Sequence, residues 1–338
     1  RQQAEVDRIL EEYKRAQMLL QSLLPEDIDA AALSSAPDVC RPAIVAIDLQ
    51  NDILEGGALA CRRIHLILPQ LKKLFARARQ MADLYWDLNH GMEDPVGMGP
   101  KIIPETRSGR AFGIPMIYLN VALILMRCDP ERKDIYAARA TQCVEEIFKY
   151  FVKFDLGCTL ENVAPDGTPR FDFTDGRIVN PGHDIEGVWF LLEYAKQFGK
   201  PELIEKAQTI FDNAIRAGWD EEYGGLLYFV DAKGLPPEAY EHDMKLWWPH
   251  DEILIASLMA YRDTGKESYL DWFNTALAYC KQHFSDRTYG EWYGYLRRDG
   301  LPTEPSTKGS TFKGPFHLPR MLCMVDSMLG ELLARQTC

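Results

Sequence analysis

The chain has 338 residues, of which 46% are hydrophobic and 26% charged, and its net charge is -12. These values are typical of a globular protein with a substantial core, and the negative charge argues against nucleic acid or membrane as a partner. The eight cysteines include no Cys-x-x-Cys pair, so neither a zinc site nor a disulfide framework is expected. We therefore expect a cytoplasmic protein with reduced thiols.

The first 80 residues differ in pattern from the rest. Residues 2–24 predict an amphipathic helix, and 42–52 predict a short buried strand that ends on acidic residues. With the helical pattern at 69–80, this stretch resembles the opening of the isochorismatase/nicotinamidase-like hydrolases, in which Asp48 would belong to an Asp-Lys-Cys triad. No Lys or Cys in that family's context follows, so we interpret 42–80 as a remnant or fusion fragment.

From residue 81 onward the chain is mainly helical and carries an internal repeat. Tyr223-Gly224 recurs as Tyr289-Gly290, and Glu186 recurs as Glu252, each 66 residues later. A unit of two helices and a β-hairpin cannot bury its apolar face alone, so stacked copies should close into a solenoid or a ring. Hairpins are expected at 222–228 and 289–295. Helix starts are expected near Pro115, Pro181, Pro249 and Pro315.

The start near Pro181 bears two chemically active side chains. His183 and Glu186 are three residues apart and share one face of the predicted helix. The positive end of that helix should disfavour the charged form of the imidazole and leave it available as a base.

Three histidines lie near a proline at equivalent helix starts, namely His183, His250 and His317. If these starts face one cavity, the histidines converge there with Glu186, Glu252 and Arg320. A metal site is disfavoured because each histidine lies on a different helix without a second ligand at i+4. Acid–base chemistry on a polyol stacked on tryptophans fits better. An inverting glycosidase using Glu186 and Glu252 stays an alternative, although it gives the histidines no role.

Residues from about 82 to 335 resemble the N-acylglucosamine 2-epimerase (renin-binding protein) family. The motifs that carry the resemblance are at 104–107, 114–117, 180–186, 247–252, 289–295 and 313–320. The resemblance implies an α/α toroid of six helix pairs and epimerisation of an N-acyl amino sugar at C2. It implies no cofactor or metal, and it leaves open a nucleotide activator and a homodimer.

The resemblance also implies residue roles. His183 and His317 match the acid–base pair that deprotonates and reprotonates C2 of the ring-opened sugar. The implied substrate-binding residues are Glu186, Trp189, Trp248, His250, Glu252 and Arg320. For Arg320 a structural role stays open.

Family members have a further part of the toroid before residue 104. The predicted fold is therefore mainly α, an incomplete α/α toroid (six-hairpin glycosidase-like) with β-hairpins, plus an N-terminal helix and a short strand. We expect an N-terminal segment at 1–80 and a toroid domain at 81–338. A disaccharide 2-epimerase, an aldose–ketose isomerase and a truncated, non-catalytic binding protein are the alternatives.

Overall fold

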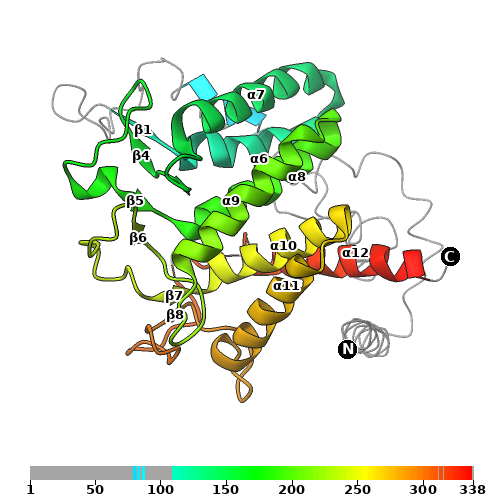
Figure 1. Cartoon of the computed structure of the whole chain (residues 1–338). Helices are drawn as coiled ribbons and strands as arrows, with labels where there is room; N and C mark the ends of the chain where they lie inside the picture. Colours follow the sequence, from blue (N-terminus) through cyan, green and yellow to red (C-terminus); the bar gives the residue numbers. More distant parts are fainter. Residues whose placement is uncertain are drawn as a thin grey trace. The chain divides into compact units, whose positions relative to one another are not determined.

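The computed structural model describes residues 79–80, 82–83, 86–87, 109–310, 312–314 and 316–336 (Figure 1). The predicted helix at 2–24, the hydrolase-like stretch up to residue 78 and the motif at 104–107 lie outside these residues. The chain divides into two compact units, Leu84–Met321 and a second one that combines Arg1–Asp83 with Leu322–Cys338. The unit Leu84–Met321 is described below.

Within the described residues, this unit is built from helix pairs. Helix α6 (Gly113–Cys128) packs against α7 (Lys133–Glu146), α8 (Pro181–Phe198) against α9 (Glu202–Gly218), and α10 (Trp247–Thr264) against α11 (Glu267–Tyr279). Helix α8 also packs against both α6 and α10. The first helices of the pairs therefore form one layer, which the second helices cover (Figure 1).

The two layers differ in sequence pattern because they differ in burial. Helices α8 and α10 are buried on almost all sides, and their sequences are correspondingly apolar. Helix α9 is amphipathic, and it buries one stripe at helical spacing: Leu203, Ala207, Ile210, Phe211 and Ala214. The predicted pairing of helices is confirmed.

The start of α8 follows the prediction. Pro181 is its first residue, and the side-chain oxygen of Asn180 accepts hydrogen bonds from the backbone N–H groups of Gly182 and His183. This cap satisfies two donors that have no partner inside the helix. It fixes the backbone from which the His183 side chain projects.

The other helix starts differ from the predicted positions by a few residues. Helix α6 begins at Gly113 and α10 at Trp247, each two residues before the expected proline. Proline is tolerated in a first turn because the N–H groups there have no helical partner. Helix α12 (Leu318–Gln336) begins after Pro315.

The repeated glycines end the first helix of two pairs. Gly199 follows α8 with φ 62° and Gly265 follows α10 with φ 69°. Both are left-handed C-caps, a conformation that glycine adopts without a Cβ clash. The repeat of this Gly-Lys pair therefore reflects the ends of equivalent helices.

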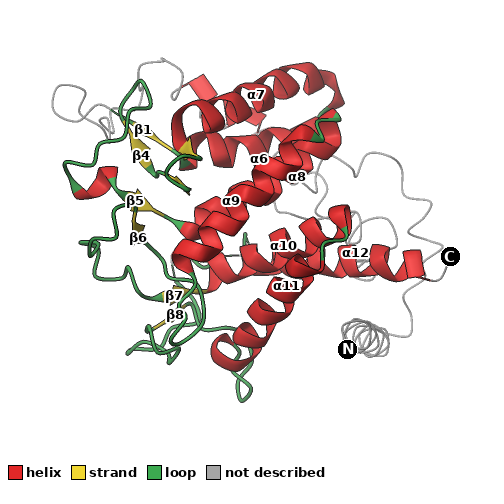
Figure 2. Cartoon of the chain, viewed as in Figure 1, coloured by secondary structure: helices red, strands yellow, loops and turns green. Residues whose placement is uncertain are grey.

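All strands are two residues long and antiparallel, and they gather at one end of the helix pairs, on the left in Figure 2. The pairs are β1 (Arg110–Ala111) with β4 (Asn162–Val163), β2 (Val152–Lys153) with β3 (Cys158–Thr159), β5 (Ile178–Val179) with β6 (Val230–Asp231), and β7 (Lys245–Leu246) with β8 (Tyr295–Leu296). The predicted hairpins at 222–228 and 289–295 are instead tight turns, each closed by one bridge, Trp219 to Leu226 and Ser285 to Trp292.

Short helices complete the described residues. They are the 3-10 helices Pro130–Arg132 and Thr174–Gly176, and the π-helical turns Ile147–Phe151 and Cys280–Phe284. In the part of the chain that the structure describes, none of the helices has the length and apolar character needed to cross a membrane.

Candidate active site

The starts of α8, α10 and α12 bring the candidate residues together. Helix α8 supplies His183, Glu186 and Trp189, and α10 supplies Trp248 and Glu252. His317 immediately precedes α12, and Arg320 lies in its first turn. These seven residues are called the α8–α12 cluster below.

Glu252 is the centre of this cluster. Its Oε1 lies 2.8 Å from Nδ1 of His317 and accepts a hydrogen bond of 2.6 Å from Nη2 of Arg320. Its Oε2 accepts a hydrogen bond of 2.6 Å from Nε1 of Trp189. Burial disfavours the charged carboxylate, but Arg320 and the hydrogen bond with His317 outweigh it and lower the pKa of Glu252. Glu252 is therefore ionised at neutral pH.

Glu186 is a second buried carboxyl group at the same guanidinium. Nη2 of Arg320 donates to its Oε1 at 3.1 Å as well as to Glu252. Burial and the negative charge of Glu252 raise the pKa of Glu186. Two carboxyl groups thus share one cation, and the charge resides on Glu252.

Glu186, Glu252 and His317 form the one group of possible metal ligands found in the described residues, with ligand atoms within 4.8 Å of one another. Arg320 donates to both carboxyl groups of this set. A guanidinium therefore supplies positive charge at the oxygens that a metal ion would need.

His183 is held by a carboxylate that the sequence analysis did not single out. Its Nδ1 lies 2.6 Å from Oε1 of Glu161, which follows strand β3. Burial lowers the pKa of His183, but the charge and the hydrogen bond of Glu161 overcome this and raise it to about 9. The predicted lowering by the helix end is therefore wrong, because a carboxylate 2.6 Å away acts more strongly than the helix dipole. No repeat offset or motif marks Glu161 in the sequence.

The two imidazoles lie against the same indole. The ring centroid of Trp248 is 5.2 Å from that of His183 and 5.4 Å from that of His317. The His183 and His317 side chains keep 29% and 16% of their surface exposed, whereas Glu252 is fully buried. In both rings Nδ1 faces a carboxylate, which directs Nε2 away from it. The arrangement can therefore offer two proton-transferring nitrogens beside one aromatic ring.

His250 does not join the cluster, contrary to the expected convergence of three histidines. Its Nε2 accepts a hydrogen bond of 3.0 Å from the backbone N–H of Leu226, and its Nδ1 donates to the carbonyl of Leu246 at 2.6 Å. Its ring stacks on Tyr279 at 5.2 Å. Burial lowers its pKa to about 3, so it stays neutral.

The reason lies in one residue of spacing. Helices α8 and α10 begin 66 residues apart, at Pro181 and Trp247, so Glu186 and Glu252 occupy the same helical position. His250 follows His183 by 67 residues, one position later. One residue rotates a side chain by about 100° around a helix axis, which turns His250 toward the backbone of Leu226.

A family model for N-acylglucosamine 2-epimerase (GlcNAc 2-epimerase) matches residues 70–313. The chain belongs to the N-acylglucosamine 2-epimerase family. The N-acylglucosamine 2-epimerase of Rattus norvegicus is 42% identical over 247 residues, which are 72% of this chain and 58% of the rat protein. The Homo sapiens protein of that name is 40% identical, over 72% of this chain and 56% of its own length. The chain therefore spans less than two thirds of the length of these relatives.

Solved structures of similar fold include two sugar enzymes. Cellobiose 2-epimerase from Bacillus thermoamylovorans superimposes with a TM-score of 0.63 at 14% identity, over 86% of this chain and 71% of that one. A D-mannose isomerase superimposes with a TM-score of 0.55 at 22% identity, over 67% of this chain and 57% of that one. These likenesses confirm the α/α toroid as the fold class of this family member.

Proposed function

We propose that the chain carries out the proton transfer of a sugar 2-epimerase, interconverting an N-acylglucosamine and an N-acylmannosamine. The observation that carries the proposal is the pair His183 and His317, both against the Trp248 ring, each with Nδ1 held by a carboxylate. A carboxylate at Nδ1 fixes the tautomer that presents Nε2 to a substrate.

The chemistry requires two proton-transferring groups. In the ring-opened sugar, C2 lies next to the C1 aldehyde, so a base removes the C2 proton and the electrons move onto the carbonyl oxygen as an enolate. A second group then protonates C2 from the opposite face, which inverts the centre. With a pKa of about 9, His183 is protonated in the free protein at neutral pH. We propose that it supplies the returned proton while His317 acts as base, and that the roles exchange in the reverse direction.

The remaining cluster residues organise this pair in the proposal. Glu252 orients His317 through Nδ1, and Trp189 in turn holds Glu252. Glu186 and Arg320 lie at the same carboxylate and are the groups proposed to contact sugar oxygens, with Trp248 as the apolar surface beneath the sugar. His250 has no place in this scheme, because backbone groups occupy both of its ring nitrogens.

Deuterium incorporation tests the proposal directly. Folded protein is incubated with N-acetylmannosamine in deuterated water, and C2 of the recovered sugars is followed by NMR. We expect deuterium at C2 and formation of N-acetylglucosamine, both abolished in His317→Ala. A ketose product would indicate the aldose–ketose isomerase alternative, and activity on cellobiose rather than the amino sugar would indicate the disaccharide 2-epimerase.

A non-catalytic binding protein is the second candidate, and the observation in its favour is length. The chain spans only 58% of the rat relative. Saturable binding of N-acetylmannosamine without deuterium exchange would support this candidate and contradict the enzyme.

Some predictions from sequence stay proposals. These are a cytoplasmic location, a homodimer, a nucleotide activator and the non-catalytic nature of the hydrolase-like stretch at 42–80. The family match begins at residue 70 and so overlaps the end of that stretch.

A further inference from the structure

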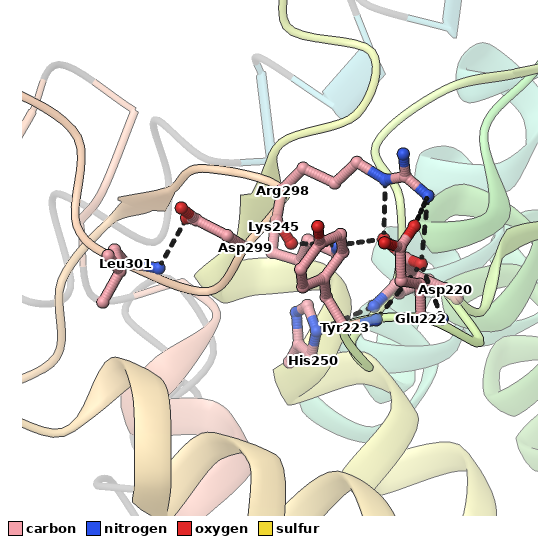
Figure 3. A network of polar contacts seen from close by, with 9 residues as sticks. Asp220, Glu222, Tyr223, Lys245, His250, Arg298, Asp299 and Leu301 are labelled. Atoms are coloured by element: carbon pink, nitrogen blue, oxygen red, sulfur yellow. Dashed lines mark hydrogen bonds and ion pairs between the residues drawn. The ribbon is translucent and has the colours of Figure 1, made fainter.

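The tight turn that follows α9 holds a buried lysine. Oδ1 of Asp220 accepts hydrogen bonds from the backbone N–H groups of Glu222 and Tyr223, and its Oδ2 accepts one of 2.6 Å from Nζ of Lys245 (Figure 3). The Tyr223 ring lies 5.9 Å from the same Nζ. Lys245 is fully buried and immediately precedes α10. Asp220, Tyr223 and Lys245 are called the first lysine clamp.

A second lysine clamp lies 66 residues later in Asp286, Tyr289 and Lys308. Oδ1 of Asp286 accepts from the backbone N–H groups of Thr288 and Tyr289, and its Oδ2 lies 2.6 Å from Nζ of Lys308. The Tyr289 ring lies 5.7 Å from that Nζ. Both turns therefore hold the segment that leads into the next helix, and the segment after the second turn carries His317.

The two clamps differ at one backbone position. Gly225 follows the first turn with φ 78°, and Glu291 follows the second with φ 64°. Among the described residues, Glu291 is the one non-glycine residue with a positive φ. Its Cβ makes this conformation unfavourable, whereas glycine has no such penalty.

The glutamate side chain makes a contact that glycine cannot make. Both carboxylate oxygens of Glu291 lie 2.5 Å from Nζ of Lys313, which also donates to the carbonyl of Lys308 at 2.8 Å. The Lys313 side chain is only 5% exposed, and its stem lies against Gly294. Lys313 is thus fixed at its charged end and along its stem.

Lys313 stands four residues before His317. Beyond that histidine, Arg320 and His317 are bound to Glu252. The segment that carries His317 is therefore fixed on one side by the α8–α12 cluster and on the other by Glu291.

Stability alone gives a weak reason for a glutamate at position 291. The Glu291 side chain is 44% exposed, and an ion pair with an exposed partner stabilises a fold only slightly. The left-handed conformation at a non-glycine residue costs a comparable amount. The equivalent position of the first clamp is Gly225, so glycine satisfies the turn itself.

We propose that Glu291 is a positioning residue for His317, acting through Lys313. By fixing Lys313 it restricts the segment that leads to His317, and so holds the imidazole at Glu252 beside Trp248. The consequence for catalysis rests on the proposed function, whereas the restraint on the His317 ring does not.

The test uses the full chain and two readouts. Ring-nitrogen NMR reports the tautomer and hydrogen bonding of each histidine, with His317 assigned through the signals lost in H317Q. Deuterium exchange at C2 of N-acetylmannosamine reports kcat and KM. The variants are E291G, which installs the residue of the first clamp, K313M, which removes the same ion pair without changing the turn, and K313R, which keeps it.

In E291G and K313M we expect the His317 ring signals to shift or broaden while those of His183 stay unchanged. The kcat should fall about tenfold, because small misplacements of a reacting group are costly, with a smaller change in KM. E291G should melt at or above the temperature of the unchanged protein, since glycine relieves the strained turn. K313R should restore the His317 signals.

The matched control is E222Q in the first clamp, where Glu222 contacts Arg298 at the surface and the following segment carries no cluster histidine. It should change neither readout. Unchanged His317 signals in folded E291G and K313M would overturn the proposal, as would a melting temperature of E291G well below that of the unchanged protein. If the unchanged protein shows no exchange at C2, the proposed function fails, and the ring signals still decide the role of Glu291.

Discussion

Nδ1 of His183 and Oε1 of Glu161 lie 2.6 Å apart, although the two residues are 22 positions apart in the chain. The contact joins the start of α8 to the loop between β3 and β4. A helix start alone would disfavour a charged imidazole, and the carboxylate reverses that preference. The protonation state of His183 is thus decided by its neighbour in space.

E161Q should lower the pKa of His183 from about 9 toward the ordinary value of 6.5, because the amide carries no charge to stabilise imidazolium. A group whose pKa is raised on folding stabilises the fold fully below its unfolded pKa, and this stabilisation is lost as the pH rises through the folded pKa. The unchanged protein should therefore lose stability between about pH 6.5 and 9 relative to E161Q. Ring NMR titration and urea unfolding at several pH values measure both effects. An unchanged His183 titration in E161Q would contradict this account.

The two carboxyl groups at Arg320 should be coupled in stability. In E252Q the negative charge of Glu252 is gone, so Glu186 can ionise and take over the pairing, and we expect a loss of only about 1–2 kcal/mol. The double variant E186Q/E252Q removes both described carboxylate partners of Arg320, and we expect a loss of about 3–5 kcal/mol, more than the sum of the single variants. Urea unfolding of all four proteins measures the coupling. Additive losses would show that the two carboxyl groups do not share the charge.

An exposed ion pair provides the control for that cycle. Arg297 and Asp299 pair at 2.5 Å, and both side chains are substantially exposed. D299N should leave the stability of the protein unchanged, because solvent screens such a pair.

H250A should destabilise the fold without altering the cluster. It leaves the N–H of Leu226 without its ring acceptor and opens a cavity beside Tyr279, so we expect a loss of about 2–4 kcal/mol. The ring signals of His183 and His317 should stay unchanged, as should C2 exchange per folded molecule. A shift of the His317 signals in folded H250A would return His250 to the candidate site.

Two glycines with positive φ should differ in their tolerance of alanine. At Gly199 a Cβ has open space, so G199A should cost about 1 kcal/mol through its backbone conformation. At Gly225 the added atom would lie 2.5 Å from a ring carbon of Tyr279, so G225A should cost about 2–4 kcal/mol. Thermal or urea unfolding measures the difference. Equal losses would show that Tyr279 moves aside freely.

The repeat made much of the fold predictable from sequence. The equal spacing of Gly199 and Gly265, and of Glu186 and Glu252, reflects equivalent helix positions, so paired helices could be inferred before any contact was known. The spacing also contained the correction for His250, since 67 residues instead of 66 turns a helical side chain by about 100°.

Sequence alone determined that His183 and His317 lie at equivalent helix starts, because local capping and apolar periodicity are encoded in neighbouring residues. Only the tertiary structure decided which groups surround them. Glu161 reaches His183 from a loop with no repeat signal, and Arg320 joins Glu186 to Glu252 across three helices. A pKa depends on burial and on charges within a few ångströms, and those distances are set by packing between elements that are far apart in the chain.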